Sequence, residues 1–259
     1  MCYFNAGLAQ TSDCDFKSRW ENSNFLGNAY DPDEFFDEFW INIKEQEARD
    51  LVKERITLAR DIGCDAVDPD NIDGWWNDVD GLNGTGWNLS EADFVNFATE
   101  LADHAHSLTT ERGHTMLIGQ KNAPDIVEQL VDVLDFAVLE DCKTLNDDED
   151  GDWTFCQEFQ AYIAEGKPVF SIEYPSTLGN TQTGACNAGG VSPEQYEASC
   201  DNTAGNSGFS TVLKIQGDVG ELNGCTQYCV EEGEDMEVVT TATDPNKDGA
   251  TCPDYAVGP

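Results

Sequence analysis

The sequence predicts an α/β fold, specifically a TIM-type (β/α)8 barrel that lacks its first strand and helix. Short apolar runs alternate with helical segments along residues 40–215, which is typical of parallel strands joined by crossover helices. Successive predicted strands end in potential catalytic or binding groups, namely Asp70, Lys121, Glu140 and Glu173. Strand ends converge on one pocket in a barrel, whereas a doubly wound sheet spreads them along an edge. Seven strands are predicted where a barrel needs eight, so we expect the missing one to precede Met1.

The first part of the chain supplies two strands and a helix. Residues 1–4 are predicted to form a strand, residues 8–39 loop and irregular structure, and residues 40–43 a second strand. A helix is predicted over residues 45–62, with Gly63 as its C-terminal cap. Its apolar face consists of Leu51, Val52, Ile56, Ala59 and Ile62.

The stretch from Gly63 to Gly74 brings carboxylates to a strand end. Its apolar run, residues 64–67, precedes Pro69 and a cluster of aspartates, which indicates a buried strand with acids at its C-terminal end. Asp68 and Asp70 are two residues apart and therefore share one face of an extended segment. The aspartate spacing does not match an EF-hand loop, so calcium is not expected here.

The alternation continues through the second half of the chain. Residues 74–89 form a Gly-, Asn- and Trp-rich loop, and Ser90 with Asp93 predicts a capping box at the start of the next helix. Pro124 is expected to begin a short helix, and another helix lies near residues 154–165. Strands are predicted over residues 115–119, 136–139, 169–172 and 209–215.

The character of the sequence changes near residue 218. We expect the barrel to occupy residues 1–217, and residues 218–259 to form an acidic, cysteine-containing tail. The segments 146–151 and 244–249 weakly resemble the first half of a calcium-binding loop. Solvated acidic turns are the simpler interpretation of both segments.

Composition limits the classes of partner. The chain has 51 acidic and 13 basic side chains, and its formal net charge of -38 argues against nucleic acid as a partner. Apolar runs are too short to span a membrane, so we expect no membrane partner. The charge permits a cationic substrate, although an acidic surface that maintains solubility is the simpler explanation.

The ten cysteines predict disulfide bonds and a secreted, extracellular protein. The glycosylation sequons at Asn83 and Asn88 agree with secretion. No metal or other cofactor is expected, because the three histidines lack a cysteine pair nearby and His104 and His106 diverge on a helix. A signal peptide does not precede the first strand, so we expect an incomplete N-terminus. We also expect a monomer.

Six segments resemble, in order, those of a known enzyme family. The segment Cys2-Tyr3-Phe4-Asn5-Ala6-Gly7 resembles CYFSAG, and residues 65–74 resemble DAVEPDNVDG. Residues 118–122 resemble a GLKN strand end, residues 136–142 resemble FAVNEEC, residues 169–174 resemble a strand ending in EY, and residues 209–214 resemble a closing STxLK strand. Together these segments resemble glycoside hydrolase family 114, the endo-α-1,4-polygalactosaminidases, over residues 1–215.

The chain also departs from the family pattern. The first family strand and helix are absent, the loop over residues 74–89 is longer, and the acidic tail has no counterpart. Asp68 replaces the Glu of the EPDN motif, Gln120 replaces the leucine of GLKN, and the NEEC motif reads Leu139-Glu140-Asp141-Cys142.

The resemblance implies that two carboxylates hydrolyse an α-1,4-linked galactosamine polymer by a retaining mechanism. Asp70 matches the EPDN aspartate and is the expected nucleophile, and Glu140 matches the NEEC glutamate and is the expected general acid/base. From the residues alone, Asp70 could instead cap a turn and Glu140 could pair with Lys121. Expected substrate-binding residues are Asp68, Asn71, Lys121, Glu173 and Tyr174. Trp75, Trp76 and Trp87 could either stack on sugars or pack within their loop.

Two other classes of function remain open. One is a carbohydrate-binding barrel without turnover, or an inactive paralogue. The other is a calcium-dependent adhesion module, which rests only on the two acidic segments.

Two structural expectations follow. A disulfide between Cys142 and Cys156 would fix the loop after Glu140, and a bond between Cys225 and Cys229 is a second expectation. If the barrel lacks a strand, the strands at residues 1–4 and 209–215 should each present an unpaired edge.

Overall fold

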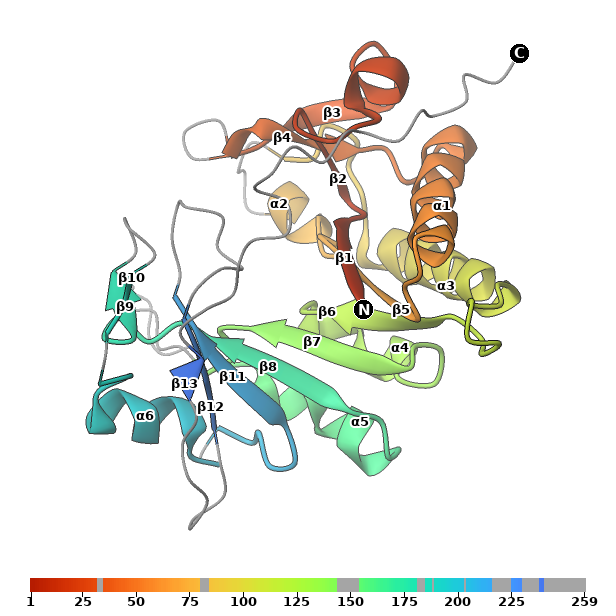
Figure 1. Cartoon of the computed structure of the whole chain (residues 1–259). Helices are drawn as coiled ribbons and strands as arrows, with labels where there is room; N and C mark the ends of the chain where they lie inside the picture. The colour runs from red at the N-terminus through yellow and green to blue at the C-terminus, as the bar shows by residue number, and fades with distance from the viewer. Residues whose placement is uncertain are drawn as a thin grey trace. The chain divides into compact units, whose positions relative to one another are not determined.

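The computed structural model describes residues 1–31, 35–79, 84–143, 154–180, 185–187, 189–202, 204–215, 225–229 and 238–239. These residues fall into two compact units, one formed by residues 1–136 and one that begins at Ala137. In both units the principal strands pair in parallel, so the fold is α/β (Figure 1).

The first unit contains a parallel sheet in the order β1-β5-β6. Its strands are β1 (Cys2–Asn5), β5 (Ala66–Asp70) and β6 (Leu117–Lys121). The predicted strand continues through Pro69, which lies opposite Phe4 of β1. The same register places Asn5 opposite Asp70, so the end of β1 lies beside the expected nucleophile.

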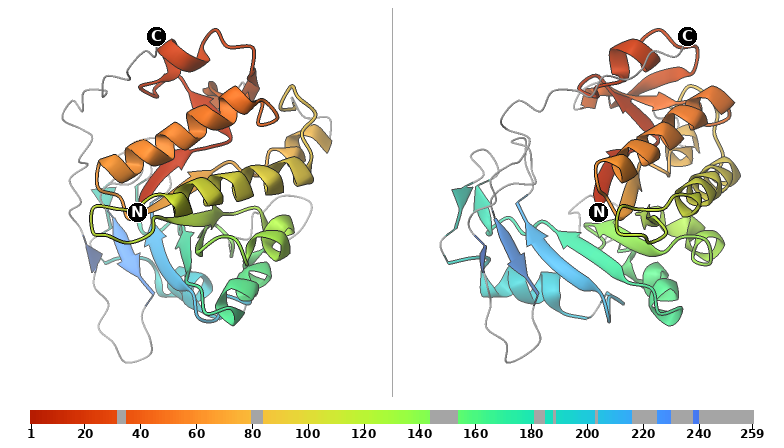
Figure 2. Two further views of the ribbon diagram at one scale, coloured as in Figure 1. Left: turned by 90° about the vertical axis from the view of Figure 1, so that its right-hand side faces the viewer. Right: turned by 45° about the vertical axis from the view of Figure 1, so that its right-hand side comes forward.

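Two long helices, α1 (Gln46–Asp61) and α3 (Glu91–Ser107), lie side by side in this unit (Figure 2). The predicted capping box at Ser90 is confirmed, because the Ser90 side chain accepts from Asp93 N–H and the Asp93 side chain accepts from Ser90 N–H. The predicted apolar face of α1 is wrong at Ile62, whose residue is 70% exposed. Arg55 is buried on α1 instead, where it forms two hydrogen bonds with Asp15.

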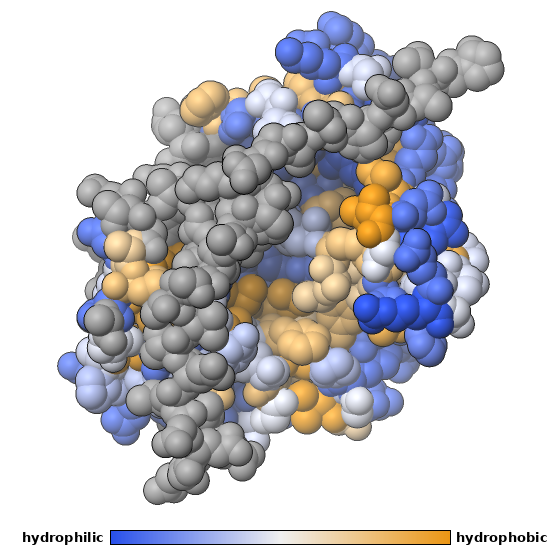
Figure 3. Space-filling model, in the orientation of Figure 1, coloured by the Kyte–Doolittle hydropathy of each residue, from blue (hydrophilic) through white to orange (hydrophobic). Residues whose placement is uncertain are grey.

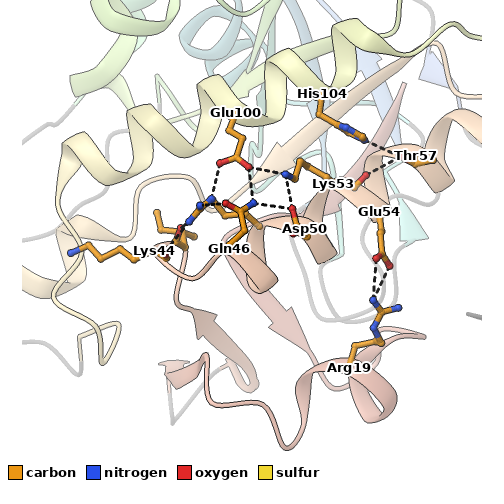
Figure 4. Close-up of polar contacts among 11 residues, drawn as sticks. Arg19, Lys44, Gln46, Asp50, Lys53, Glu54, Thr57, Glu100 and His104 are labelled. Atoms are coloured by element: carbon orange, nitrogen blue, oxygen red, sulfur yellow. Dashed lines mark hydrogen bonds and ion pairs between the residues drawn. The ribbon is translucent and has the colours of Figure 1, made fainter. Parts of the chain in front are cut away.

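Charged side chains join α1 to α3 (Figure 4). Glu100 of α3 accepts a 2.6 Å hydrogen bond from Arg49 and a 2.7 Å hydrogen bond from Lys53, both on α1. His104 of α3 lies 2.9 Å from the hydroxyl of Thr57, and its pKa is lowered by burial and by the Lys53 charge. This face of the unit therefore uses several of the chain's few cations to hold its helices together.

Three strands between Leu8 and Ile41 form an antiparallel sheet, so the expectation of loop followed by a barrel strand is wrong here. The strands β2 (Leu8–Gln10), β3 (Leu26–Asp31) and β4 (Phe35–Ile41) pair in the order β2-β4-β3, and the short π-helix η1 (Phe16–Trp20) lies between β2 and β3. Residues 40–41, assigned to a barrel strand, belong to β4, which pairs with β2 and β3. Bulges between β3 and β4 break the period-two pattern by which strands are recognised in a sequence.

Short helices complete the first unit. They are α2 (Trp75–Val79), the 3-10 helix η2 (Pro124–Ile126) and α4 (Val127–Leu130), and Pro124 begins its helix as predicted. Trp75 is buried, with its ring 5.5 Å from that of Phe94, whereas Trp76 is 41% exposed. Trp75 therefore packs within the unit, and Trp76 alone of this pair presents a large exposed surface.

The second unit contains the parallel strands β7 (Phe136–Glu140), β8 (Val169–Glu173) and β11 (Ser210–Lys214). These strands agree closely with the predicted ones. The helix expected near residues 154–165 is a 3-10 helix, η3 (Cys156–Phe159), followed by α5 (Gln160–Ala164). Between β8 and β11 lie the hairpin strands β9 (Gly179–Asn180) and β10 (Ala185–Cys186) and the helix α6 (Pro193–Cys200).

Part of the expected tail joins this second sheet. The strand β12 (Thr226–Tyr228) pairs antiparallel with β11, and β13 (Val238–Val239) pairs with β12. The expected unpaired edge at residues 209–215 is therefore wrong, because hydrogen-bonding groups of β11 are satisfied by β12. The segments 146–151 and 244–249, which weakly resemble calcium loops, lie outside the described residues.

Disulfides fix both units. The predicted bond between Cys142 and Cys156 is confirmed, with their Cα atoms 5.0 Å apart. The bond expected between Cys225 and Cys229 is wrong, because the first pairs with Cys186 and the second with Cys200. A further bond joins Cys2 of β1 to Cys64, next to β5. In the second unit, two bonds therefore tie the residues that flank β12 to Cys186 and Cys200, and the third closes a short loop after β7.

Part of the surface of the first unit is hydrophilic. Figure 3 shows mostly hydrophilic residues along the margin where α1 and α3 lie. Within the part of the chain that the structure describes, no helix combines the length and apolarity that crossing a membrane requires.

Candidate active site

Asp70 lies at the C-terminal end of β5 with two donors on one carboxylate oxygen. The Tyr3 hydroxyl donates a 2.6 Å hydrogen bond to Oδ2, and the Lys121 ammonium contacts the same oxygen at 3.0 Å. The Lys121 side chain is only 3% exposed, and its ammonium also lies 5.6 Å from the centre of the Tyr3 ring. Tyr3 of β1 and the ends of β5 and β6 thus place a hydroxyl, a carboxylate and an ammonium together.

The other oxygen of Asp70 is bound by the chain that follows. The Asn71 N–H donates a 2.7 Å hydrogen bond to Oδ1, and Asn71 has a left-handed backbone with φ of 57°. The Asn71 side chain donates to Oδ1 of Asn5 at 3.1 Å. The described contacts of Asn71 therefore support Asp70, while its expected contact with substrate stays a prediction.

Several acids and a tyrosine surround Asp70 within the first unit. Burial and the nearby charge of Asp70 raise the pKa of Asp73 to about 6, and Lys121 opposes this shift. The pKa of Glu38 on β4 is raised by burial and by neighbouring acids that include Asp70. Burial, Asp73 and Asp70 also raise the pKa of Tyr30. The region around Asp70 is therefore strongly negative, which favours cations.

Asp68, two residues before Asp70 on β5, is 3% exposed. It lies opposite Tyr3 in the register of β1 with β5. Asp68 was expected to bind substrate from the same face as Asp70, but its burial leaves little of its surface for a direct contact.

In the second unit, Glu140 ends β7 and Tyr174 directly follows β8. The Tyr174 hydroxyl donates a hydrogen bond to Oε1 of Glu140. Asp141 has a left-handed φ of 52°, and its N–H donates to the Ile172 carbonyl at 2.9 Å. The disulfide at Cys142 anchors the next residue, so the backbone after Glu140 is held at consecutive positions. The structure thus brings Glu140 and Tyr174 together.

Glu173 is buried at 1% exposure and accepts a 2.8 Å hydrogen bond from Ser171. It lies in the unit's interior near the Cys142–Cys156 bond, where the three side chains form a cluster whose ligand atoms lie within 4.8 Å of one another. Both sulfurs are covalently joined, and metal binding by cysteine requires a free thiolate. These residues are therefore poorly suited to hold a metal.

Sequence reasoning missed three side chains of this region. Tyr3 was assigned only to a strand, Tyr30 fell in an expected loop, and Glu38 fell in the same loop. None has a local motif that distinguishes it from a packing or surface residue. The parallel pairing of β1 with β5 is the signal that could have identified Tyr3, because it puts Tyr3 opposite Asp68, two residues before Asp70 on β5.

Known proteins resemble this chain over most of its length. A family model described as glycoside-hydrolase family GH114 matches residues 1–234. The crystal structure of Aspergillus fumigatus Ega3 in complex with galactosamine is similar, with 36% identity and a TM-score of 0.64, over 83% of this chain and 73% of that chain. A variant of the glycoside hydrolase domain of PelA from Pseudomonas aeruginosa has 12% identity and a TM-score of 0.49, over 82% of this chain and 76% of that chain.

No curated protein matches the chain. The family match nevertheless extends over both units described above, from β1 through β12. In addition, a relative of known structure is 36% identical over 83% of this chain. The chain is therefore a glycosidase that belongs to glycoside hydrolase family GH114.

Proposed function

We propose that this glycosidase cleaves α-1,4-linked galactosamine-containing polysaccharide with retention of configuration, using Asp70 as nucleophile and Glu140 as general acid/base. The observation that carries the proposal is the environment of Asp70, whose Oδ2 accepts from Tyr3 and contacts Lys121. Hydrogen bonds from a hydroxyl and an ammonium stabilise negative charge on a carboxylate and fix its orientation. A nucleophilic carboxylate needs both properties.

The proposed reaction has two displacement steps. In the first, Asp70 attacks the anomeric carbon while Glu140 gives its proton to the leaving glycosidic oxygen, which breaks the bond and forms a glycosyl ester. In the second, Glu140 takes a proton from water, whose oxygen displaces Asp70 and restores the free enzyme. Retention requires the two carboxyl groups to be about 5–5.5 Å apart.

The surroundings of Glu140 support its assigned role. A general acid/base must exchange a proton and hold its position through both steps. The hydrogen bond from Tyr174 and the fixed backbone at Asp141 hold Glu140 at the end of β7. Glu173, on the neighbouring strand, is the alternative carboxylate, but it is buried and occupied by Ser171.

The charge of the protein supports an amino-sugar substrate. Galactosamine units carry ammonium groups, and the chain has a net charge of -38 with Glu38, Asp70 and Asp73 gathered in one unit. The solved relative with 36% identity is a complex with galactosamine. Asp68, Asn71, Lys121, Glu173 and Tyr174 remain the proposed binding residues.

We infer three further properties. The parallel strands and their crossover helices support a (β/α)8-type barrel, the disulfides support secretion, and a monomer is expected. Small-angle scattering would test the barrel and the monomer together. Expression in a secreting host, followed by detection in the medium, would test secretion.

The test of function is incubation with partially deacetylated α-1,4-galactosaminogalactan, followed by mass spectrometry of released oligosaccharides. NMR of the first product would identify the anomer, and an initial product with inverted configuration would reject the retaining mechanism. Asp70→Asn and Glu140→Gln should each abolish release while preserving the fold. If the wild-type protein binds the polymer without cleaving it, a non-catalytic carbohydrate-binding role replaces the proposal.

A further inference from the structure

The junction between Asp70 and Asn71 is clamped by the turn that follows β1. The main-chain carbonyl of Asp70 accepts hydrogen bonds from the N–H groups of Ala6 and Gly7, each at 3.0 Å. The turn approaches so closely that a Cβ on Gly7 would lie 1.7 Å from the Asn71 carbonyl oxygen. Only glycine permits this approach, so the sequence of the turn is adapted to the end of β5.

The main chain of Asn71 binds one oxygen of the Asp70 carboxylate. Its φ of 57° is sparsely populated by residues other than glycine, although asparagine tolerates it better than most. The Asn71 N–H donates to Oδ1 of Asp70, and the left-handed φ sets the direction in which the Asn71 side chain leaves this junction. The remaining oxygen, Oδ2, is thereby presented to Tyr3 and Lys121.

Asn5 holds the Asn71 side chain. Its Oδ1 accepts from Asn71 Nδ2 at 3.1 Å and from Leu8 N–H at 2.9 Å. Because a backbone N–H can only donate, the Leu8 contact requires the oxygen of the Asn5 amide to face this way. Asn5 is 4% exposed, and its own carbonyl accepts a 3.0 Å hydrogen bond from Arg55.

Arg55, which binds the main chain of Asn5, is itself held in place by two aspartates. Its guanidinium binds Asp15 at 3.0 and 2.7 Å and Asp13 at 2.8 Å, and it lies 5.3 Å from the centre of the Trp20 ring. The Arg55 side chain is 9% exposed. A continuous set of hydrogen bonds therefore runs from the buried Arg55 through Asn5 and Asn71 to Asp70.

We propose that Asn5 is a positioning residue for Asp70, acting through the Asn71 side chain. This inference rests on the proposed nucleophilic role of Asp70. Attack on an anomeric carbon is sensitive to the position of the nucleophile, and a displacement of about 1 Å can lower a rate by roughly 100-fold. Asn5 touches neither the carboxylate nor, in this assignment, the substrate, so its loss should affect the chemical step more than binding.

Kinetics of the full chain test the proposal, with partially deacetylated α-1,4-galactosaminogalactan as substrate. Asn5→Ala should lower kcat per folded molecule by about 10- to 100-fold and change KM by less than about 3-fold. Asn71→Gly removes the same contact, and glycine accepts the left-handed backbone without strain. The double variant should be no slower than the slower single variant, because both remove one link. Effects that multiply would overturn the proposal.

A matched control separates positioning from stability. Asn42 is also a nearly buried asparagine in the same unit, and its Oδ1 accepts from Lys44 N–H at 3.1 Å. Asn42→Ala should lower the melting temperature and leave kcat per folded molecule unchanged. If Asn5→Ala behaves in the same way, its role is structural only and the proposal fails.

The variant Asp70→Asn separates failure of the proposed function from failure of the positioning role of Asn5. If that variant retains turnover, the nucleophile is misassigned and the proposed function fails with it. If Asp70→Asn is inactive while Asn5→Ala keeps the wild-type kcat, only the positioning role fails. Should Asn5→Ala not fold, Asn71→Gly alone decides the question, and an unchanged kcat in it overturns the proposal.

Discussion

The hydroxyl of Tyr3 donates a 2.6 Å hydrogen bond to Oδ2 of Asp70, from β1, the strand that pairs with β5. Tyr3 is itself 55% exposed, although its hydroxyl contacts a carboxylate that is largely buried. The Lys121 ammonium lies beside both groups, which makes the carboxylate, the phenol and the ammonium one electrostatic unit. Substitution of Tyr3 or Lys121 should therefore lower the rate of turnover.

Tyr3→Phe should lower kcat/KM by roughly 10-fold. It removes one hydrogen bond to a charged group, worth about 1.5–3 kcal/mol, while the ring and its contact with Lys121 stay in place. The measurement is initial-rate kinetics on the galactosamine polymer. Tyr228→Phe is the control, because Tyr228 is 49% exposed and lies on β12 in the other unit. Equal activity in Tyr3→Phe and the wild type would show that the hydroxyl does not act on Asp70 during catalysis.

Lys121→Met should lower turnover more strongly than Tyr3→Phe. Methionine preserves much of the buried stem, but it leaves the Asp70 carboxylate without the cation beside it. We expect a loss of at least about 100-fold in kcat/KM, because truncating one partner of a buried ion pair costs about 3–5 kcal/mol and each 1.4 kcal/mol is about tenfold. Lys143→Met is a matched control, because Lys143 is equally buried but pairs with Asp201 in the second unit. A smaller effect in Lys121→Met than in the control would contradict this role.

Local patterns in the sequence predicted the elements that depend on local interactions. The capping box at Ser90, the helix begun by Pro124 and the strand before Glu140 all follow from neighbouring residues. The antiparallel sheet over residues 8–41 was missed because its strands are short, bulged and paired across the η1 segment. Pairings of that kind are set by tertiary packing, which periodicity does not record.

The candidate site likewise contains residues that local sequence identifies and a residue that only strand pairing brings to the site. Asp70 and Glu140 were recognisable because each follows an apolar run at a strand end and matches a family segment. Tyr3 could not be recognised from its own neighbours, because its role arises only when β1 pairs with β5. Cysteine spacing was equally ambiguous. It identified the bond over the short segment from Cys142 to Cys156, but not the long-range bonds of Cys186 and Cys200.

Removal of the Cys142–Cys156 bond should destabilise the second unit. The bond closes a short loop, for which the chain-entropy model gives about 3 kcal/mol. The variant Cys142→Ser/Cys156→Ser should therefore melt at a lower temperature, as measured by differential scanning calorimetry. Activity should fall as well, because the bond fixes the chain two residues after Glu140. Loss of stability without any loss of activity in the remaining folded protein would show that Glu140 is positioned independently of the bond.

Asp73 should make stability depend on pH in the acidic range. Its pKa is raised to about 6 by burial and by Asp70, against an ordinary value of 3.8. Between these two pH values the Asp73 carboxyl is mostly ionised in the unfolded chain but mostly protonated in the folded one. The free energy of unfolding therefore falls as pH rises from about 4 to 6. Above pH 6 the full penalty is present, on the order of 2–3 kcal/mol. Asp73→Asn removes the ionisation and should therefore be more stable than the wild type at neutral pH.

The pH dependence of that difference is the decisive measurement. Urea unfolding of Asp73→Asn and the wild type should give a gap in midpoint that is widest above pH 6, narrows towards pH 4 and closes below it, where the wild-type carboxyl becomes protonated in both states. Asp103→Asn, an exposed change on α3, should show no such closing gap. A gap for Asp73→Asn that stays constant from pH 4 to pH 7 would mean that the Asp73 carboxyl is not destabilised by its ionisation beside Asp70. The acidic cluster would then be better solvated than its burial indicates.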